Sequence, residues 1–193
     1  MDEIVKAALR KWPNVPHCHG WLALDARGDW YMRDDRVQAA GPFPAVKGSR
    51  IDHDALKAFI HRNYDHDDAG CWFFQNGPQR VYVELEVAPW IWRAEASDGG
   101  FALASHTGLP VQPRAAWSDE RGRLYFETER GLGLVHTLDT GIAAQALEAG
   151  TWPAPAEMPF AGMPARFGYV LSPQAVSLQA GHAVSADPAT GPG

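Results

Sequence analysis

The segment from Cys71 to Arg93, CWFFQNGPQRVYVELEVAPWIWR, constrains the fold of this chain more than any other stretch. It contains two apolar runs separated by Asn76-Gly77, a dipeptide that is among the strongest short-range signals for a β-hairpin. After this turn apolar and polar residues alternate, which is the period of a strand with one buried face. The sequence therefore predicts a hairpin whose second strand has one face on a core and the other in water. The core-facing residues are Val81, Val83, Leu85 and Val87, and the water-facing residues are Arg80, Tyr82, Glu84 and Glu86.

Length and charge limit the function classes to which this chain can belong. With 193 residues it can form one domain or two small ones around a sizeable core. Its formal net charge of −6 and the lack of any basic run argue against nucleic-acid binding. No apolar run approaches the roughly 20 residues that cross a bilayer, and the N-terminal segment lacks the apolar stretch of a signal peptide. Cys18 and Cys71 are too few for a disulfide framework, so we expect a cytoplasmic bacterial protein.

Helix and turn signals divide the first half of the chain. Residues 2–11 carry apolar side chains on one side and precede a proline, as a short helix does. A strand, a tight turn and a second strand follow, with Gly28 available for a positive φ in the turn. Residues 33–49 are predicted to be loop, and Asp52 is the expected N-cap of a helix over residues 53–63.

The same pattern starts again beyond the central hairpin. Residues 119–126 repeat four of the eight residues in segment 25–32. Residues 138–147 parallel the start of the predicted helix, and residues 167–178 parallel the hairpin strands of residues 72–83. We therefore expect an α+β fold of two tandem ββαββ-like units whose mainly antiparallel sheets pack together. The expected boundaries are an N-terminal helix in residues 1–15, a first unit in 16–95, a second unit in 96–180 and a disordered tail in 181–193.

Several of these segments resemble a known family. The run from Arg80 to Trp90 resembles the Lys-Val-x-Ile-x-Val-Glu-Asp-Ala-Pro-Phe run of an uncharacterised proteobacterial family, domain of unknown function twelve-eighty-five (DUF1285). Residues 16–31 are similar to the opening of that family, and Thr107-Gly108 and residues 129–132 look like two of its later motifs. The resemblance, to this family or to a sister family of it, implies two small packed α+β units with a role in ligand binding or signal transduction. The Glu-Lys pair that follows the hairpin turn in the family is Gln79-Arg80 here.

His17-Cys18-His19 is the motif most typical of a metal site. In an extended segment the two histidines point to the same side, so they could share a Zn²⁺ ion that needs three or four protein ligands. His53 would then supply a third ligand, and the protein would be a metal-dependent hydrolase. The alternative is a buried cysteine with hydrogen-bonded flanking histidines, and no CxxC or HExxH motif supports metal binding over it.

The other candidate catalytic groups lack a motif. Ser105, His106 and Asp119 are the residue types of a hydrolytic triad, but no Gly-x-Ser-x-Gly turn accompanies them. Gly131 and Gly133 form a GxG without the third glycine or the lysine of a phosphate-binding loop. The sequence therefore favours a non-enzymatic protein and leaves any cofactor unidentified.

Two tryptophans and a set of polar turn residues are the remaining candidates for function. Trp90 and Trp92 share one face of a strand, where they form either a seam in the core or an exposed patch for a homodimer. A cleft between two units is a usual place for a ligand pocket, and arginine binds a carboxylate or phosphate in bidentate fashion. We therefore expect a regulatory protein that binds a small anionic ligand or a protein partner in such a cleft. The candidate ligand-binding residues are Arg27, Tyr31, Gln79, Arg80, His106 and Arg130.

Overall fold

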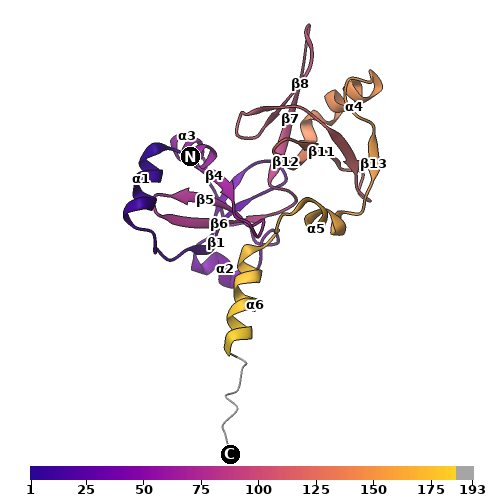
Figure 1. Ribbon diagram of the computed structural model, residues 1–193. Coiled ribbons are helices and arrows are strands. Elements are labelled where there is room, and N and C mark those ends of the chain that lie inside the picture. Colours follow the sequence, from indigo (N-terminus) through magenta and orange to yellow (C-terminus); the bar gives the residue numbers. More distant parts are fainter. Residues whose placement is uncertain (186–193) are drawn as a thin grey trace, which may run out of the picture.

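The chain forms two β-sheets packed against helices, in a computed structural model that describes residues 1–185, with side chains up to residue 180 (Figure 1). The fold is α+β with two similar units of mainly antiparallel strands, as the sequence predicted. Within residues 1–185 no helix combines the length and the apolar character needed to span a membrane. The helices are α1 (Glu3–Lys11), α2 (Asp35–Ala40), α3 (Asp54–Arg62), α4 (Thr140–Glu148), α5 (Met163–Phe167) and α6 (Pro173–Ser185), with 3-10 turns η1 (Thr137–Asp139) and η2 (Phe160–Gly162).

The first sheet belongs to the N-terminal unit and has the order β3-β2-β1-β6-β5-β4. Its neighbouring strands are antiparallel except for the central pair β1 and β6, which run parallel with Leu22 opposite Val83. The hairpin at Asn76-Gly77 is confirmed, with Gly77 at φ +57°. The strands are β1 (Cys18–Leu24), β2 (Trp30–Met32), β3 (Ser49–Arg50), β4 (Tyr64–His66), β5 (Trp72–Asn76) and β6 (Gln79–Leu85).

The second sheet has the order β13-β10-β11-β12-β7-β8-β9. Its central pair, β7 and β12, is also parallel, with Ile91 opposite Leu134. The predicted boundary between the units at residue 95 lies inside β7, because this strand begins directly after the last strand of the first sheet. The strands are β7 (Trp90–Ser97), β8 (Gly100–Ser105), β9 (Pro110–Val111), β10 (Ala115–Ser118), β11 (Leu124–Thr128), β12 (Gly131–Val135) and β13 (Pro155–Glu157).

The two sheets repeat one strand order, but with a different correspondence from the one that the sequence predicted. Strands β1 to β6 occupy the same relative places as β7 to β12. The turn at Asp119 between β10 and β11 therefore corresponds to the turn at Asp67 between β4 and β5, and not to the turn at Asp25. In the second unit no helix separates β9 from β10, and α4 follows the last repeated strand instead.

A single turn chemistry explains why the sequence comparison selected the wrong pair. Asp25, Asp67 and Asp119 each stand three residues before a glycine of positive φ, and each Oδ1 accepts hydrogen bonds from the backbone N–H groups two and four residues later. The other carboxylate oxygen of each accepts from a tyrosine hydroxyl. The similarity of residues 119–126 to 25–32 therefore reflects a repeated turn, which occurs at Asp25 and Asp67 in the first sheet and at Asp119 in the second.

Three predictions of local structure are wrong. Residues 167–178 do not form a second hairpin, because α5 ends at Phe167 and α6 begins at Pro173, whose fixed φ suits the first turn of a helix. The predicted loop 33–49 contains α2, where Asp34 caps the helix by accepting a hydrogen bond from the N–H of Val37 at 2.9 Å. Helix α3 is present, but His53 caps it in place of Asp52. Of the predicted tail, residues 181–185 end α6, and residues 186–193 lie outside the described residues.

Helix α6 returns from the second unit to the first and packs on β1 and β6 (Figure 1). At its start the N–H of Gln174 donates to Oε1 of Glu84 at 3.0 Å. Because this face of the sheet is covered, Glu84 is only 3% exposed and Tyr82 only 7%, and the predicted water-facing side of β6 is wrong at these two positions.

One continuous core joins the two units. It includes Leu24 and Leu85 from the first sheet and Phe126 and Leu134 from the second. Trp90 and Trp92 lie within this core as a stacked pair with ring centroids 5.9 Å apart, and they are 5% and 0% exposed. The predicted tryptophan seam is therefore confirmed, and the alternative of an exposed dimer patch at these residues is wrong.

Candidate functional site

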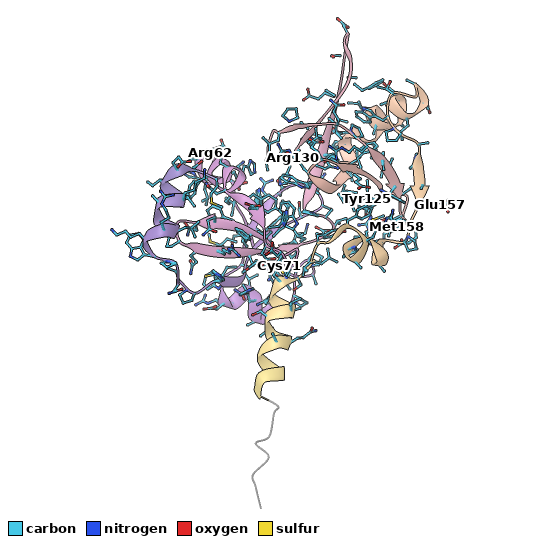
Figure 2. The ribbon with its side chains drawn as sticks, in the orientation of Figure 1. Arg62, Cys71, Tyr125, Arg130, Glu157 and Met158 are labelled. Atoms are coloured by element: carbon cyan, nitrogen blue, oxygen red, sulfur yellow. The ribbon has the colours of Figure 1, made fainter. Side chains whose placement is uncertain are left out.

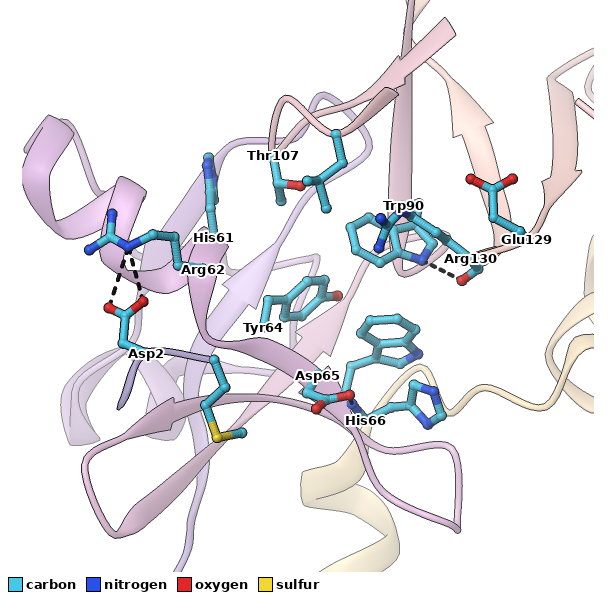
Figure 3. Close-up of a pocket in the computed structure, with 13 residues that line it drawn as sticks. Asp2, His61, Arg62, Tyr64, Asp65, His66, Trp90, Thr107, Glu129 and Arg130 are labelled. Carbon is cyan, nitrogen blue, oxygen red and sulfur yellow. Dashed lines mark hydrogen bonds and ion pairs between the residues drawn. The ribbon is translucent and has the colours of Figure 1, made fainter. Parts of the chain in front are cut away.

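A cavity of about 600 Å³ lies at the junction of the two units (Figure 3). The first unit contributes the end of α3, the edge strand β4 and part of β5, while the second contributes the start of β7 and two turns. We call this space the junction cavity. It is lined by Met1, Asp2, His61, Arg62, Tyr64, Asp65, His66, Trp72, Trp90, Thr107, Leu109, Glu129 and Arg130.

The end of helix α3 fixes one wall of the junction cavity. The buried side chain of Asn63 follows the helix, donates to the carbonyl of Phe59 at 3.0 Å and accepts from the N–H of Asp2 at 2.8 Å. This arrangement holds the first residues of the chain beside the helix end, where Nε of Arg62 lies 3.3 Å from the Asp2 carboxylate. The charge of Arg62 is therefore already compensated.

The second unit presents its polar groups on two tight turns. The hydroxyl of Thr128 accepts from the N–H of Arg130 at 3.1 Å, and Gly131 has φ +103°, so that Glu129 and Arg130 stand at the tip between β11 and β12. In the other turn, Ser105 Oγ lies 2.7 Å from the hydroxyl of Thr107, which faces the cavity. Figure 2 shows Arg62 on the first unit and Arg130 on the second, on the two sides of the junction.

Aromatic side chains form the floor of the junction cavity. Tyr64 packs against Trp72 with centroids 4.7 Å apart, and Trp72 meets Trp90 at 5.2 Å and an interplanar angle of 82°. The indole N–H of Trp90 donates to the carbonyl of Arg130 at 2.8 Å, and the hydroxyl of Tyr64 donates to the carbonyl of Pro89 at 3.0 Å. Because these polar ends are already bonded, the floor offers a rigid apolar surface.

Two histidines connect this floor to the core. His61 lines the cavity, and burial lowers the pKa of its imidazole. His106 lies behind it with ring centroids 5.7 Å apart, and its Nδ1 accepts from the N–H of Ile91 at 3.3 Å. Burial first, and His61 second, lower the pKa of His106 to about 3, so that its ring is neutral at physiological pH. The Nε2 atom of His106 is buried without a hydrogen-bond partner in the described part of the chain.

Three charged side chains of the junction cavity have no ion pair among the residues that the structure describes. They are Asp65 on the first unit and Glu129 and Arg130 on the second. In Figure 3 the Asp65 carboxylate lies below the aromatic floor and that of Glu129 lies above it. A second cavity of about 260 Å³ continues past Arg130 and shares His66 and Trp72 with the first. The site can therefore offer both signs of charge beside an aromatic surface.

Comparison with known proteins places this arrangement in a family. Residues 1–174 match the family model DUF2944, whose description is "Protein of unknown function (DUF2946)". The chain belongs to the DUF2944 family. No curated protein matches it.

Two solved structures are similar to this DUF2944 protein. One is a DUF1285 family protein from Shewanella baltica, with a TM-score of 0.42 and 16% identity over 65% of this chain and 91% of the other. The second is a DUF1285 family protein from Silicibacter pomeroyi, with a TM-score of 0.48 and 14% identity over 75% of this chain and 84% of the other. Both belong to DUF1285, the family that the sequence was found to resemble.

Among the residues predicted to bind a ligand, two lie at the junction of the DUF2944 protein. Arg130 lines the cavity, and His106 lies directly behind its wall. Arg27 belongs to the turn whose Gly28 packs on His106, since a Cβ atom at that glycine would lie 3.0 Å from the histidine Cβ. The hydroxyl of Tyr31 donates to Asp25 instead of facing the cavity.

The other two predicted residues lie elsewhere on the first unit. The Gln79 side chain donates to the carbonyl of Pro16 at 2.9 Å, and Arg80 lies over the ring of Phe73 at 4.4 Å. Three residues that line the junction cavity were not predicted from the sequence, namely His61, Tyr64 and Glu129. The one available signal was weak, namely that polar residues flank the end of a helix and the tip of a hairpin.

The metal and triad alternatives receive no support from the arrangement of their residues. His17 and His19 both pack on the ring of Tyr82, at 5.9 and 4.5 Å, while Nδ1 of His53 accepts from the N–H of Leu56 at the start of α3. Among residues 1–180 no group of three or more potential metal ligands occurs. Asp119 is bonded within its own turn, and Cys71 is buried, which raises the pKa of its thiol.

Proposed function

We propose that this DUF2944 protein is a non-enzymatic regulatory protein that binds a small molecule in the junction cavity. One observation carries the proposal: two units that share a single core leave between them a polar-rimmed, aromatic-floored space of about 600 Å³. This volume is within the range of small-molecule sites, which typically combine an apolar surface with a few polar groups that fix orientation.

The contribution of both units favours a regulatory role. A ligand that touches Asp65 in β4 of one unit and Arg130 on a turn of the other gains both contacts only when the two units are held in this arrangement. Binding would therefore favour one relative position of the units over others, which is how a ligand shifts the population of a protein's states.

A thermal-shift screen of the full chain against a library of soluble metabolites tests the proposal. We expect at least one compound to raise the melting temperature, and we expect Arg130→Ala to reduce that shift. Arg121→Ala is the matched control, because Arg121 is an exposed arginine on another turn of the second unit and does not line the junction cavity. If no compound stabilises the protein, or if both variants respond like the wild type, the proposal is wrong.

A further inference from the structure

The unpaired charges of the junction cavity define the class of ligand that fits it. A ligand with several negative charges, such as a nucleoside triphosphate, would meet two uncompensated carboxylates, Asp65 and Glu129, and one guanidinium, Arg130. A purely cationic ligand would leave Arg130 without a partner, and a neutral one would leave all three side chains unpaired. Charged groups that lose water on binding without gaining a partner lower affinity, so each of these classes fits poorly.

We infer, on the basis of the proposed function, that the ligand is a zwitterion with the head group of an α-amino acid and an apolar body. Its carboxylate binds the guanidinium of Arg130, its ammonium group binds Asp65, with Glu129 adding to the negative field, and its body lies on Tyr64, Trp72 and Trp90. Charge-assisted hydrogen bonds of this kind are the strong ones, and a planar guanidinium suits a carboxylate.

The surroundings of these residues agree with this assignment. The perpendicular rings of Trp72 and Trp90 form an apolar corner, and the indole N–H of Trp90 is already bonded to the carbonyl of Arg130, so a hydrocarbon or aromatic body can lie against these ring faces. The adjoining cavity past Arg130 gives room for bodies of different length. Arg62 does not compete for the ligand carboxylate, because Asp2 already pairs with it.

Isothermal titration of the full chain with a matched set of probes tests the ligand class. The set contains L-phenylalanine and L-leucine, 3-phenylpropanoate, which lacks the ammonium group, and 2-phenylethylamine, which lacks the carboxylate. We expect one of the amino acids to bind, and with L-phenylalanine we expect each truncated analogue to bind roughly ten-fold or more weakly.

Two variants assign the two charges. Asp65→Asn should lower the affinity for the amino acid toward that of 3-phenylpropanoate and leave the affinity for 3-phenylpropanoate itself unchanged. Arg130→Gln should lower the affinity for the amino acid toward that of 2-phenylethylamine. It should leave the affinity for 2-phenylethylamine itself unchanged. Arg121→Gln, on a turn outside the junction cavity, should leave every affinity unchanged.

The outcomes separate this inference from the proposed function. If neither amino acid binds, or if 3-phenylpropanoate binds as tightly as L-phenylalanine, the ligand class is wrong. If the metabolite screen nevertheless finds a ligand whose effect is lost in Arg130→Ala, the binding function stands with a different ligand. If both the probes and the screen fail, both proposals are wrong.

Discussion

The indole N–H of Trp30 donates a hydrogen bond to Nε2 of His61 across 3.0 Å. An indole nitrogen is a donor only, so Nε2 of His61 is the acceptor, and the proton of the neutral imidazole resides on Nδ1. Burial, which is the larger effect, and the charge of Lys57 also lower the pKa of His61. The surroundings of His61 in the wall of the junction cavity therefore favour its neutral imidazole.

Replacing Trp30 by phenylalanine should raise the pKa of His61 toward its ordinary value, because the neutral ring loses the donor that a protonated ring cannot use. An NMR titration that follows the imidazole protons of His61 measures this change. Trp117→Phe is the matched control, since the indole N–H of Trp117 has no hydrogen-bond partner among the described residues. An unchanged pKa in Trp30→Phe would show that this hydrogen bond does not select the tautomer.

His106 should make the protein sensitive to acid. Its pKa of about 3 lies below the ordinary value of 6.5. Between these two pH values the imidazole is therefore protonated in the unfolded chain and neutral in the folded chain. The stability is complete above pH 6.5 and falls as the pH decreases toward 3, by an amount on the order of several kcal/mol. His106→Asn keeps an acceptor for the N–H of Ile91 and cannot titrate, so its unfolding free energy should fall less between pH 7 and pH 4.

Urea unfolding at a series of pH values measures this difference. Part of the slope should persist in His106→Asn, since the pKa of His61 is lowered as well. Parallel curves for His106→Asn and the wild type would contradict the assignment of this titration to His106.

Adding a side chain at Gly133 should lower the free energy of unfolding. A Cβ atom there would collide with the indole of Trp92, which is fully buried and donates to the carbonyl of Phe126 at 2.9 Å. Gly133→Ala should therefore cost roughly 1–3 kcal/mol of unfolding free energy, as overpacking of a core does. Gly141→Ala in α4 meets no atoms within 4 Å and should be neutral or stabilise by up to about 1 kcal/mol. Equal effects of the two substitutions in denaturant unfolding would rule out the collision.

Glu84 should give the opposite pH dependence from His106. Its burial beneath α6 raises the pKa of the carboxyl, although Ser172, the N–H of Gln174 and Arg33 act against the shift. The folded state thus favours the protonated acid, and the associated stability is present below the ordinary pKa of 4.5 and is lost as the pH rises through the folded value. Glu84→Gln retains an acceptor for Gln174 and carries no charge, so its stability relative to the wild type should increase over that window.

Glu84→Ala completes the comparison, since it removes the acceptor as well as the charge. We expect it to cost about 1–3 kcal/mol, because the partly buried N–H of Gln174 is left without its acceptor. Thermal unfolding of the three proteins between pH 4 and pH 8 measures both effects. A constant difference between Glu84→Gln and the wild type over that range would refute the assigned titration.

Local chemistry made much of the fold predictable from the sequence. Asn76-Gly77 marked the central hairpin, and the positive φ of Gly28 marked the turn between β1 and β2, because glycine adopts these conformations without steric cost. The two-unit α+β architecture followed from the recurrence of such signals. The sequence could not show which turn of the first unit corresponds to the turn at Asp119 in the second. Asp25, Asp67 and Asp119 all form the same kind of turn.

The candidate site was predictable only in part, because it depends on contacts between segments far apart in the sequence. Arg130 was found from its place at a hairpin tip, but nothing in the sequence around Tyr64 indicates that it will meet Trp90 across the junction at 5.5 Å. The burial of Glu84 could not be predicted from the alternation in its strand. The helix that covers it begins about 90 residues later and was predicted to be a strand, since residues 167–178 parallel the hairpin strands of residues 72–83.

The return of α6 to the first sheet has a consequence for how the protein is made. The outer face of β6 remains open on a nascent chain until the residues around Gln174 have left the ribosome, so the N-terminal unit cannot complete its structure while the second unit is still being synthesised. A fragment that stops after residue 95 would lack α6 and leave Glu84 open to solvent. The two halves are therefore duplicated in architecture, yet the sheet of the first half is covered by a helix that is synthesised after the second.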